Sequence, residues 1–313
     1  MELPQYNNLT DKNAVQSFAS ITIDNKRDFD SWYNGHKEVK DLIYRGVNEA
    51  KYKNFTSSQR EWITKEYSKE GVLYKDFIGQ IIFTLKNNSL LKSYFKSNNI
   101  AINDILCLVY LQHFSAPTPL LDFTYDLDDA LFFALDGLKD VSSSNDIDNY
   151  FSIYSICLAD KELTKADSFF NNALKKANEL VTGFKKDNPS LDVDVELLNN
   201  VDKFTSWNNG LSGITKFLIP NPLRSQPVKM NNGDQLLWSN INLIAQEGCL
   251  ILNSDEKTPL EGLQYTNIEC VNIHKHLAEY IKEKYLKGLD RENIYPDNYK
   301  IAKEAYNQFK KQL

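Results

Sequence analysis

Short runs in which apolar and polar side chains alternate are separated, in this chain, by longer runs in which apolar side chains recur every three or four positions. The first pattern predicts β-strands and the second predicts amphipathic helices. Strands are expected at 18–23, 41–44, 150–158, 214–219, 249–252 and 268–273. Helices are expected after Asp24 or Asn25, from Ser58, over 72–96, from Asn103 or Asp104, between Asp126 and Gly137, and over 160–182, 275–287 and 297–311. Because the two kinds of element do not alternate regularly, we expect an α+β fold, with a mixed sheet core and several packed helices.

No strong linker divides the chain, so a single elaborated domain is expected. A strand and a helix at 1–39 extend its N-terminus, and the central part spans 40–255. The C-terminal strand and helices, 256–313, are expected to pack on the same domain. A segment at about 160–212 is expected to be an insertion into the central part, because residues 186–210 are polar and interrupted by Asn and Gly.

Composition narrows the classes of function. A hydrophobic fraction of 42% and a charged fraction of 25% are typical of a folded chain, and a net charge of −6 argues against broad nucleic-acid binding. No apolar run approaches the roughly 20 residues that span a bilayer, and the N-terminal segment does not resemble a signal peptide. The expected location is therefore the cytoplasm, without a membrane partner. Buried thiols of a reducing compartment are expected at Cys107, Cys157, Cys249 and Cys270.

The stretch 112–124, QHFSAPTPLLDFT, places polar side chains and two prolines between two apolar helices. Such residues lower helix and strand propensity, so we expect 115–124 to be a stiff loop that shapes a polar concavity. His113 is suited to act as acid, base or hydrogen-bond donor, and a purely helix-terminal role is the alternative. Asp122 is expected to accept hydrogen bonds from His113, Arg45 or backbone amides, and a turn or capping role stays open.

Two further polar clusters lie at the ends of expected strands. Arg45 presents a planar fork of donors that suits phosphate or carboxylate, and Gly46 is expected to leave room for a ligand near the backbone. Pairing of Arg45 with a core carboxylate or with carbonyl groups is the structural alternative. Gln246 and Glu247 precede the strand that Gly248 opens and point to opposite sides, so one of them is expected to face a pocket.

Several common signatures are missing from the chain. It contains no GxGxxG, P-loop, HExxH or GxSxG motif, which are the usual marks of nucleotide, zinc and acyl-transfer sites. Its four histidines are too few to suggest a multi-histidine metal centre. His274 and His276 flank an expected strand-to-helix boundary and are interpreted as surface residues. No metal site is expected.

Three segments, taken in order, resemble the FRG domain family of bacterial proteins. They are YRG at 44–46, QHFSAPTPLLDFTYDLDDALFFAL at 112–135 and AQEGCLIL at 245–252. The resemblance extends over roughly residues 40–255. The ligand-binding residues that it implies, together with the reading of the residues above, are Tyr44, Arg45, Gly46, Gln112, Thr118, Thr124, Asn242 and Gln246. The catalytic residues are His113, Asp122 and Glu247.

The chain departs from the family pattern at three positions. Pro119 stands where the family usually has Arg after Pro-Thr, and Asn242 stands where it usually has Arg before Q-x-G. Ser115 replaces a Gly, which is a milder change. The two missing arginines imply weaker anion binding or a different ligand, with Arg45 as the principal remaining cation of the site.

The order of these motifs is also similar to the layout of ADP-ribosyltransferases of the bacterial-toxin type, in which an Arg orients the phosphates of NAD and a late carboxylate stabilises the transition state. This resemblance implies a pocket for a nucleotide-like anionic ligand, with NAD as the candidate cofactor. Arg45 is then expected to hold the phosphates, His113 and Asp122 to orient the ligand or a nucleophile, and Gln246 or Glu247 to contact the ribose. Whether the chain is an enzyme stays open at this point.

Two other interpretations remain. The first is a non-catalytic module that senses a ligand or binds a protein partner, in bacterial stress or phage defence by family association. The second is that the motif serves folding alone, with Arg45 and Asp122 paired in the core. Removing one partner of such a buried pair costs about 3–5 kcal/mol.

Overall fold

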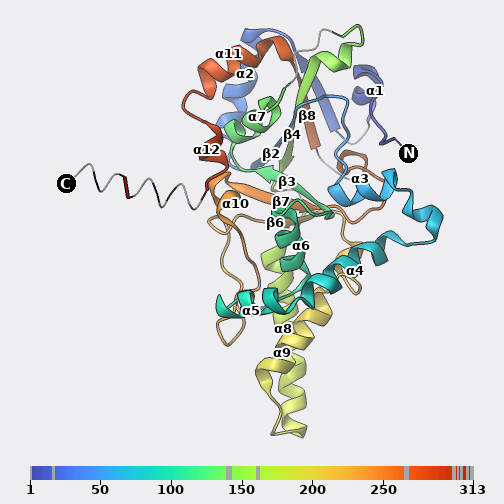
Figure 1. Ribbon diagram of the computed structural model, residues 1–313, viewed down its shortest axis with the longest axis vertical. Helices are drawn as coiled ribbons and strands as arrows, with labels where there is room; N and C mark the ends of the chain where they lie inside the picture. The colour runs from blue at the N-terminus through green and yellow to red at the C-terminus, as the bar shows by residue number, and fades with distance from the viewer. Residues whose placement is uncertain are drawn as a thin grey trace.

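An eight-stranded mixed sheet runs through the protein, in the order β1-β8-β4-β2-β3-β7-β6-β5 (Figure 1). The computed structural model describes residues 2–15, 18–138, 143–159, 163–263 and 268–297, and residues 301, 303, 306, 307 and 310. The strands are β1 (Phe18–Ile23), β2 (Leu42–Val47), β3 (Leu120–Thr124), β4 (Tyr150–Cys157), β5 (Thr164–Lys165), β6 (Phe217–Ile219), β7 (Gly248–Leu252) and β8 (Ile268–His274). The prediction of an α+β fold with a mixed sheet is confirmed.

The sheet has two halves that are joined at one residue pair. β2 pairs with β4 over six residues and β3 pairs with β7 over five, but β2 and β3 share only the pair Tyr44–Thr124. In Figure 1 the strands β2, β4 and β8 run steeply, whereas β3, β7 and β6 run across the view. The two central strands therefore diverge, and their facing edges leave backbone groups that need other partners.

Helices cover both halves of the sheet. The longer ones are α2 (Lys26–Lys37), α3 (Ser57–Thr64), α4 (Tyr74–Lys86), α5 (Ser89–Ser97), α6 (Asp104–His113), α7 (Leu127–Leu135), α8 (Ala166–Asp187), α9 (Val193–Thr205) and α11 (Ala278–Tyr285). The short helices are α1 (Leu9–Asn13), α10 (Ile241–Ala245) and α12 (Arg291–Ile294). One core lies between α2, α7, α11 and the steep strands, and a second lies between α4, α6, α8, α9 and the strands β3, β6 and β7.

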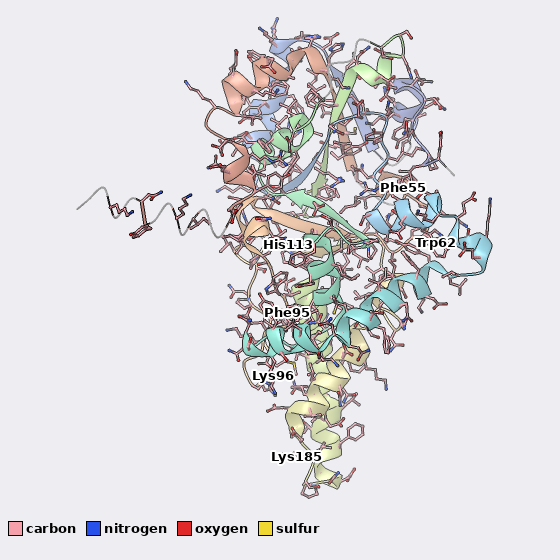
Figure 2. The ribbon with its side chains drawn as sticks, viewed as in Figure 1. Phe55, Trp62, Phe95, Lys96, His113 and Lys185 are labelled. Atoms are coloured by element: carbon pink, nitrogen blue, oxygen red, sulfur yellow. The ribbon has the colours of Figure 1, made fainter. Side chains whose placement is uncertain are left out.

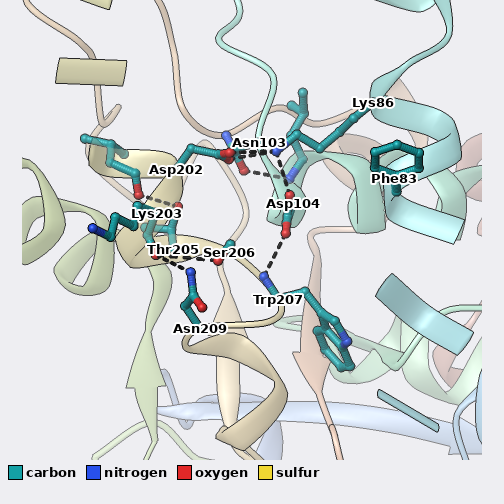
Figure 3. A network of polar contacts seen from close by, with 12 residues as sticks. Phe83, Lys86, Asn103, Asp104, Asp202, Lys203, Thr205, Ser206, Trp207 and Asn209 are labelled. Atoms are coloured by element: carbon teal, nitrogen blue, oxygen red, sulfur yellow. Dashed lines mark hydrogen bonds and ion pairs between the residues drawn. The ribbon is translucent and has the colours of Figure 1, made fainter. Parts of the chain in front are cut away.

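Helices α8 and α9 form a hairpin that extends away from the sheet (Figure 1). Its base is held by Lys86, which forms ion pairs with Asp104 and Asp202 at 2.8 Å each (Figure 3). The other oxygen of the Asp104 carboxylate accepts a 2.7 Å bond from the backbone N–H of Trp207. The polar stretch 186–210 thus contains a helix, because Leu197 and Val201 pack against the core while the remaining face is polar.

Several helix boundaries differ from those expected, among them those of the helix predicted over 160–182, which is α8 and spans Ala166–Asp187. The run 72–96 contains two helices, because the side chain of Asn88 accepts a hydrogen bond from the N–H of Leu91 and begins a new helix there. The capping box of α3 is Thr56–Gln59, so the helix begins one residue before Ser58.

The prediction of a loop over 115–124 is wrong for the second half of that segment. Residues 120–124 form β3, a central strand whose side chains are buried except for Asp122. A strand covered on both faces has no alternation to reveal it. The loop proper is therefore short, and it ends in the sheet.

Three smaller findings complete the fold. The four cysteines are free thiols, and all but the half-buried Cys157 are buried, which raises the pKa of Cys107 to about 12. The helix predicted at 275–287 is present as a short 3-10 turn and α11, whereas most of the helix predicted at 297–311 falls outside the described residues. Within the described part of the chain, no helix has both the length and the apolarity to cross a membrane.

Gly46 is required by helix packing. A Cβ at this position would lie 1.9 Å from the carbonyl oxygen of Ala130 and 2.7 Å from the backbone nitrogen of Ala134. Both atoms belong to the backbone of α7, which cannot yield in the way that a flexible side chain can. The space into which a side chain at Gly46 would point is thus filled by α7, so helix packing by itself requires a glycine here.

We predict that Gly46→Ala destabilises the fold by at least about 2 kcal/mol, because α7 must move away from β2. Urea unfolding followed by circular dichroism measures the free energy of unfolding. The matched control is Gly35→Ala in α2, where the added Cβ meets no atom within 4 Å and a helical Ala should stabilise by about 0.5–1 kcal/mol. Equal stability of the two variants would contradict the close packing of α7 on β2.

Candidate functional site

The three polar motifs of the sequence meet at one cavity, with a volume of about 310 Å³. It lies where β2 and β3 diverge, between the end of α6 and the segment that leads into β7. Nine of the eleven residues named from the sequence line it: Tyr44, Arg45, Gly46, Gln112, His113, Asp122, Thr124, Asn242 and Gln246. We call this cavity the first pocket.

Arg45 bridges the gap between the two halves of the sheet. Its Nη1 donates a 2.8 Å hydrogen bond to the backbone carbonyl of Asp122 in β3, and its Nε donates a 3.1 Å bond to Oδ1 of Asn54. Burial lowers the pKa of Arg45, but a guanidinium keeps its charge in proteins. Two of its five N–H donors are used in these bonds, so the others can face a ligand.

One interpretation of the sequence was that Arg45 and Asp122 form an ion pair in the core. That ion pair is not formed. The bond from Arg45 reaches the main chain of Asp122, and the Asp122 side chain is exposed to the cavity. Asp122 instead receives a 2.8 Å bond on Oδ2 from the amide nitrogen of Gln112. Its other carboxylate oxygen has no hydrogen-bond partner among the described residues.

Thr118 holds Gln112 in one orientation. The Thr118 hydroxyl donates to the amide oxygen of Gln112, so the amide nitrogen must point to Asp122. Thr118 itself does not line the first pocket. Its backbone N–H donates a 2.9 Å bond to the Ser57 hydroxyl, and its carbonyl accepts from the N–H of Ser58. Thr118 thus positions the Asp122 carboxylate indirectly, through Gln112, and its main-chain bonds connect this loop to α3.

His113 ends α6 where that helix meets the strands (Figure 2). Its ring lies edge-on to Phe114 and Trp238, at centroid distances of 4.7 and 6.3 Å. Burial beside these rings lowers the pKa of His113. Neither ring nitrogen is hydrogen-bonded to another described residue, so the predicted contact with Asp122 is not formed. The imidazole is free to act on a ligand in its neutral form.

The wall opposite Asp122 comes from the segment before β7. Thr124 Oγ1 donates a 2.7 Å bond to the carbonyl of Gln246 and accepts one from the N–H of Asp126. The Gln246 amide nitrogen donates a 2.9 Å bond to the carbonyl of Ile294 near the C-terminus. Asn242, also in this wall, has a buried Oδ1 without a hydrogen-bond partner in the described structure. This wall therefore offers amide groups and no charge.

Glu247 is not brought to the first pocket. Its carboxylate forms an ion pair with Arg224, whose guanidinium lies 5.0 Å from the centroid of the Tyr125 ring. The backbone of Glu247 has a φ of +41°, in the left-handed region, which turns the chain between α10 and β7. Asp122 is therefore the only acidic side chain, and Arg45 the only permanently charged basic one, among the described residues that line the first pocket.

Sequence reasoning missed two aromatic residues of the first pocket. Phe133 reaches it from α7 and Tyr295 from the turn after α12, with ring centroids 6.2 Å apart. Phe133 stands in the apolar run of α7, where it reads as a core residue. Tyr295 stands in a turn far from the three motifs, and no sequence signal connects it with them.

We predict that His113 titrates with a midpoint below 6.5, the usual histidine value, because its burial disfavours the charged ring. The imidazole is then neutral at pH 7. The unfolded chain binds this proton more readily, so the contribution of His113 to stability is complete above pH 6.5 and is lost as the pH falls through the folded pKa. NMR of the histidine ring signals, assigned with His113→Gln, measures the midpoint. A midpoint above 6.5 would contradict the burial argument.

Comparison with known proteins supports the family resemblance. The family model of the FRG domain matches residues 40–143, which include β2, α3, α6, β3 and α7. The Gln246 wall of the first pocket lies outside the matched range. No curated protein and no solved structure gives a significant match. The first two motifs, and with them Arg45, Gln112, His113 and Asp122, lie within the match, so residues 40–143 of the chain are similar to the FRG domain family.

Proposed function

We propose that the first pocket binds a nucleotide-like anionic ligand, with NAD as the ligand to test. The observation that carries this proposal is the convergence of Arg45, Asp122 and Gln246, from three distant segments, on one cavity of about 310 Å³. Cavities of roughly 300–1,000 Å³ are typical of small-ligand sites. Mere packing does not require an exposed carboxylate beside an arginine with unused donors.

The polar groups divide the pocket into two kinds of surface. Arg45 supplies positive charge at the junction of β2 and β3, where a phosphate fits its remaining donors. Asp122, Gln246 and Asn242 supply acceptors and amides, which suit the hydroxyl groups of a ribose. Phe133 and Tyr295 add flat apolar surface for a ring. A nucleotide carries these three chemical features in one molecule.

The catalytic form of the proposal is transfer of ADP-ribose. The bond between the ribose C1′ and nicotinamide breaks, nicotinamide leaves with the bonding electrons, and an acceptor hydroxyl or amine forms the new bond to C1′. The free oxygen of Asp122 stabilises the positive charge that develops on the sugar. Neutral His113 accepts the proton that the acceptor loses. Asp122 takes the role that sequence alone assigned to Glu247.

The second candidate is a module that binds the ligand or a protein partner without converting it. Two observations favour it: Glu247 is paired with Arg224 outside the pocket, and the family arginines are replaced by Pro119 and Asn242. Ligand binding in this form would signal to a partner, in the stress or phage-defence context that the family suggests. Both candidate functions use the first pocket, and they differ in whether the bound ligand is chemically converted.

We predict that the wild-type protein binds NAD, measured by calorimetry, and releases nicotinamide, measured by chromatography. Asp122→Asn keeps the shape of the side chain and removes its charge, so nicotinamide release should fall about 10²–10³-fold. Glu247→Gln is the matched control and should leave the rate unchanged, since this residue lies outside the pocket. Arg45→Lys keeps a charge but loses the fork, and should weaken binding about tenfold or more.

Each result decides between the candidates. Binding without nicotinamide release supports the non-catalytic module, and no binding at all rejects the ligand proposal. Arg45→Ala is less informative, because it also removes the bridge from β2 to β3. Thermal melts of all variants separate such loss of stability from loss of function.

A further inference from the structure

A second cavity of about 380 Å³ adjoins the first pocket. Both cavities are lined by Arg45, Gly46 and Phe133, so they meet at the point where β2 leaves β3. The second cavity extends from there toward the segment before α3, which contributes Lys53 and Asn54, and toward α3 itself. Figure 2 shows Phe55, another residue of its lining, on the α3 side of the sheet.

The side chains that line the second cavity carry a net positive charge. Three basic side chains line it, Arg45, Lys53 and Arg60, and none of its described lining residues is acidic. This concentration is unusual in a chain whose net charge is −6. The first pocket, by contrast, contains one arginine and one carboxylate. Charge of a single sign in a cleft attracts ligands of the opposite sign.

Arg60 is held in place by the same loop that positions Asp122. It lies in the first turns of α3, whose start is fixed by the Thr56–Gln59 capping box. The N–H of Ser58 donates a 3.1 Å bond to the carbonyl of Thr118, which fixes α3 against this loop. Arg60 itself makes no side-chain hydrogen bond or ion pair with any described residue. Its exposed side chain lines the second cavity, with donors that no described residue uses.

Some polar groups that line the second cavity have no partner among the described residues. Burial lowers the pKa of Arg45 most, the charge of Arg60 lowers it further, and the carboxylates of Asp122 and Glu261 oppose these effects. Asn54, whose Oδ1 accepts from Arg45, is buried and leaves its Nδ2 without a partner among the described residues. The Nζ of Lys53 lies 4.9 Å from the centroid of the Tyr6 ring, and no acidic side chain of the described residues pairs with it. An anion would offset the mutual repulsion of these cations.

We propose that Arg60 and Lys53 form a second phosphate site, so that the ligand extends from the first pocket into the second cavity and contains a diphosphate. This inference rests on the proposed function for the identity of the ligand, but not for the anion site itself. Arg45, at the junction, contacts the phosphate nearer the first pocket, and Arg60 contacts the farther one. The substrate class is then a dinucleotide or another diphosphate, and a simple nucleoside lacks the group that the second cavity binds.

The test uses the full chain with three probes: NAD, nicotinamide riboside, which lacks phosphate, and inorganic pyrophosphate. We expect Arg60→Gln to weaken the binding of NAD and of pyrophosphate at least about tenfold, as for loss of a charged hydrogen bond. Lys53→Gln should act in the same direction and more weakly, because a lysine lacks the bidentate fork. Nicotinamide riboside should bind equally to the wild type and both variants.

The matched control is Arg27→Gln, since Arg27 is exposed on α2 and lines neither cavity. It should bind all three probes as the wild type does. If NAD binds but Arg60→Gln does not weaken it, the second site is wrong while the first pocket stands. If pyrophosphate binds through Arg60 but NAD does not bind, the second site stands and the proposed function fails. If the wild type binds neither pyrophosphate nor NAD, both are wrong.

Discussion

The hydrogen bond from Arg45 to the carbonyl of Asp122 is the interaction on which the site depends. Backbone pairing between β2 and β3 consists of the single pair Tyr44–Thr124, after which the strands diverge. A carbonyl left at such an edge needs a donor, and the guanidinium of Arg45 supplies it at 2.8 Å. The gap that the divergence opens becomes the wall of a cavity. One side chain therefore both closes the sheet and provides the positive charge beside the cavity.

Several motif residues have this double role, which explains why their pattern is so distinct in the sequence. Gly46 allows the backbone of α7 to contact β2, and Thr124 joins the start of α7 to the Gln246 wall. Thr118 orients Gln112, and through it Asp122, while its main chain fixes α3. The ligand-facing groups are few, and the remaining motif residues hold them. A substitution at Gly46 or Thr118 therefore acts on the site through the fold.

Elements could be predicted from the sequence where their pattern of apolar and polar residues fits only one kind of secondary structure. Strands β1, β4 and β8 and helices α2 and α6 follow directly from periodicity and caps, and the motif residues were grouped because they are polar between apolar elements. Strand β3 was missed because Leu120, Leu121 and Phe123 are all buried, so no alternation appears. Helix α9 was missed because only a narrow stripe of it packs against the core.

The site residues that escaped prediction have ordinary local reasons to be where they are. Arg60 stands on the polar face of an amphipathic helix, where an arginine normally faces solvent. The bonds of Thr118 with Ser57 and Ser58 help to hold that helix beside the cavity, and these bonds are contacts between distant segments. Sequence patterns report local burial, whereas the meeting of two segments is a property of the whole fold.

The placement of Arg60 also changes the meaning of the missing family arginines. Pro119 is buried, and its carbonyl accepts a 2.9 Å bond from the N–H of Asn253, so this position serves the strand edge. Asn242 gives the β7 side of the first pocket an uncharged amide. The positive charge lies instead on the α3 side, in Arg60 and Lys53. The potential at a site depends on where charges lie in space and not on which segment carries them. The positive charge of the cleft therefore comes from Arg45, Arg60 and Lys53, which lie in other segments than Pro119 and Asn242.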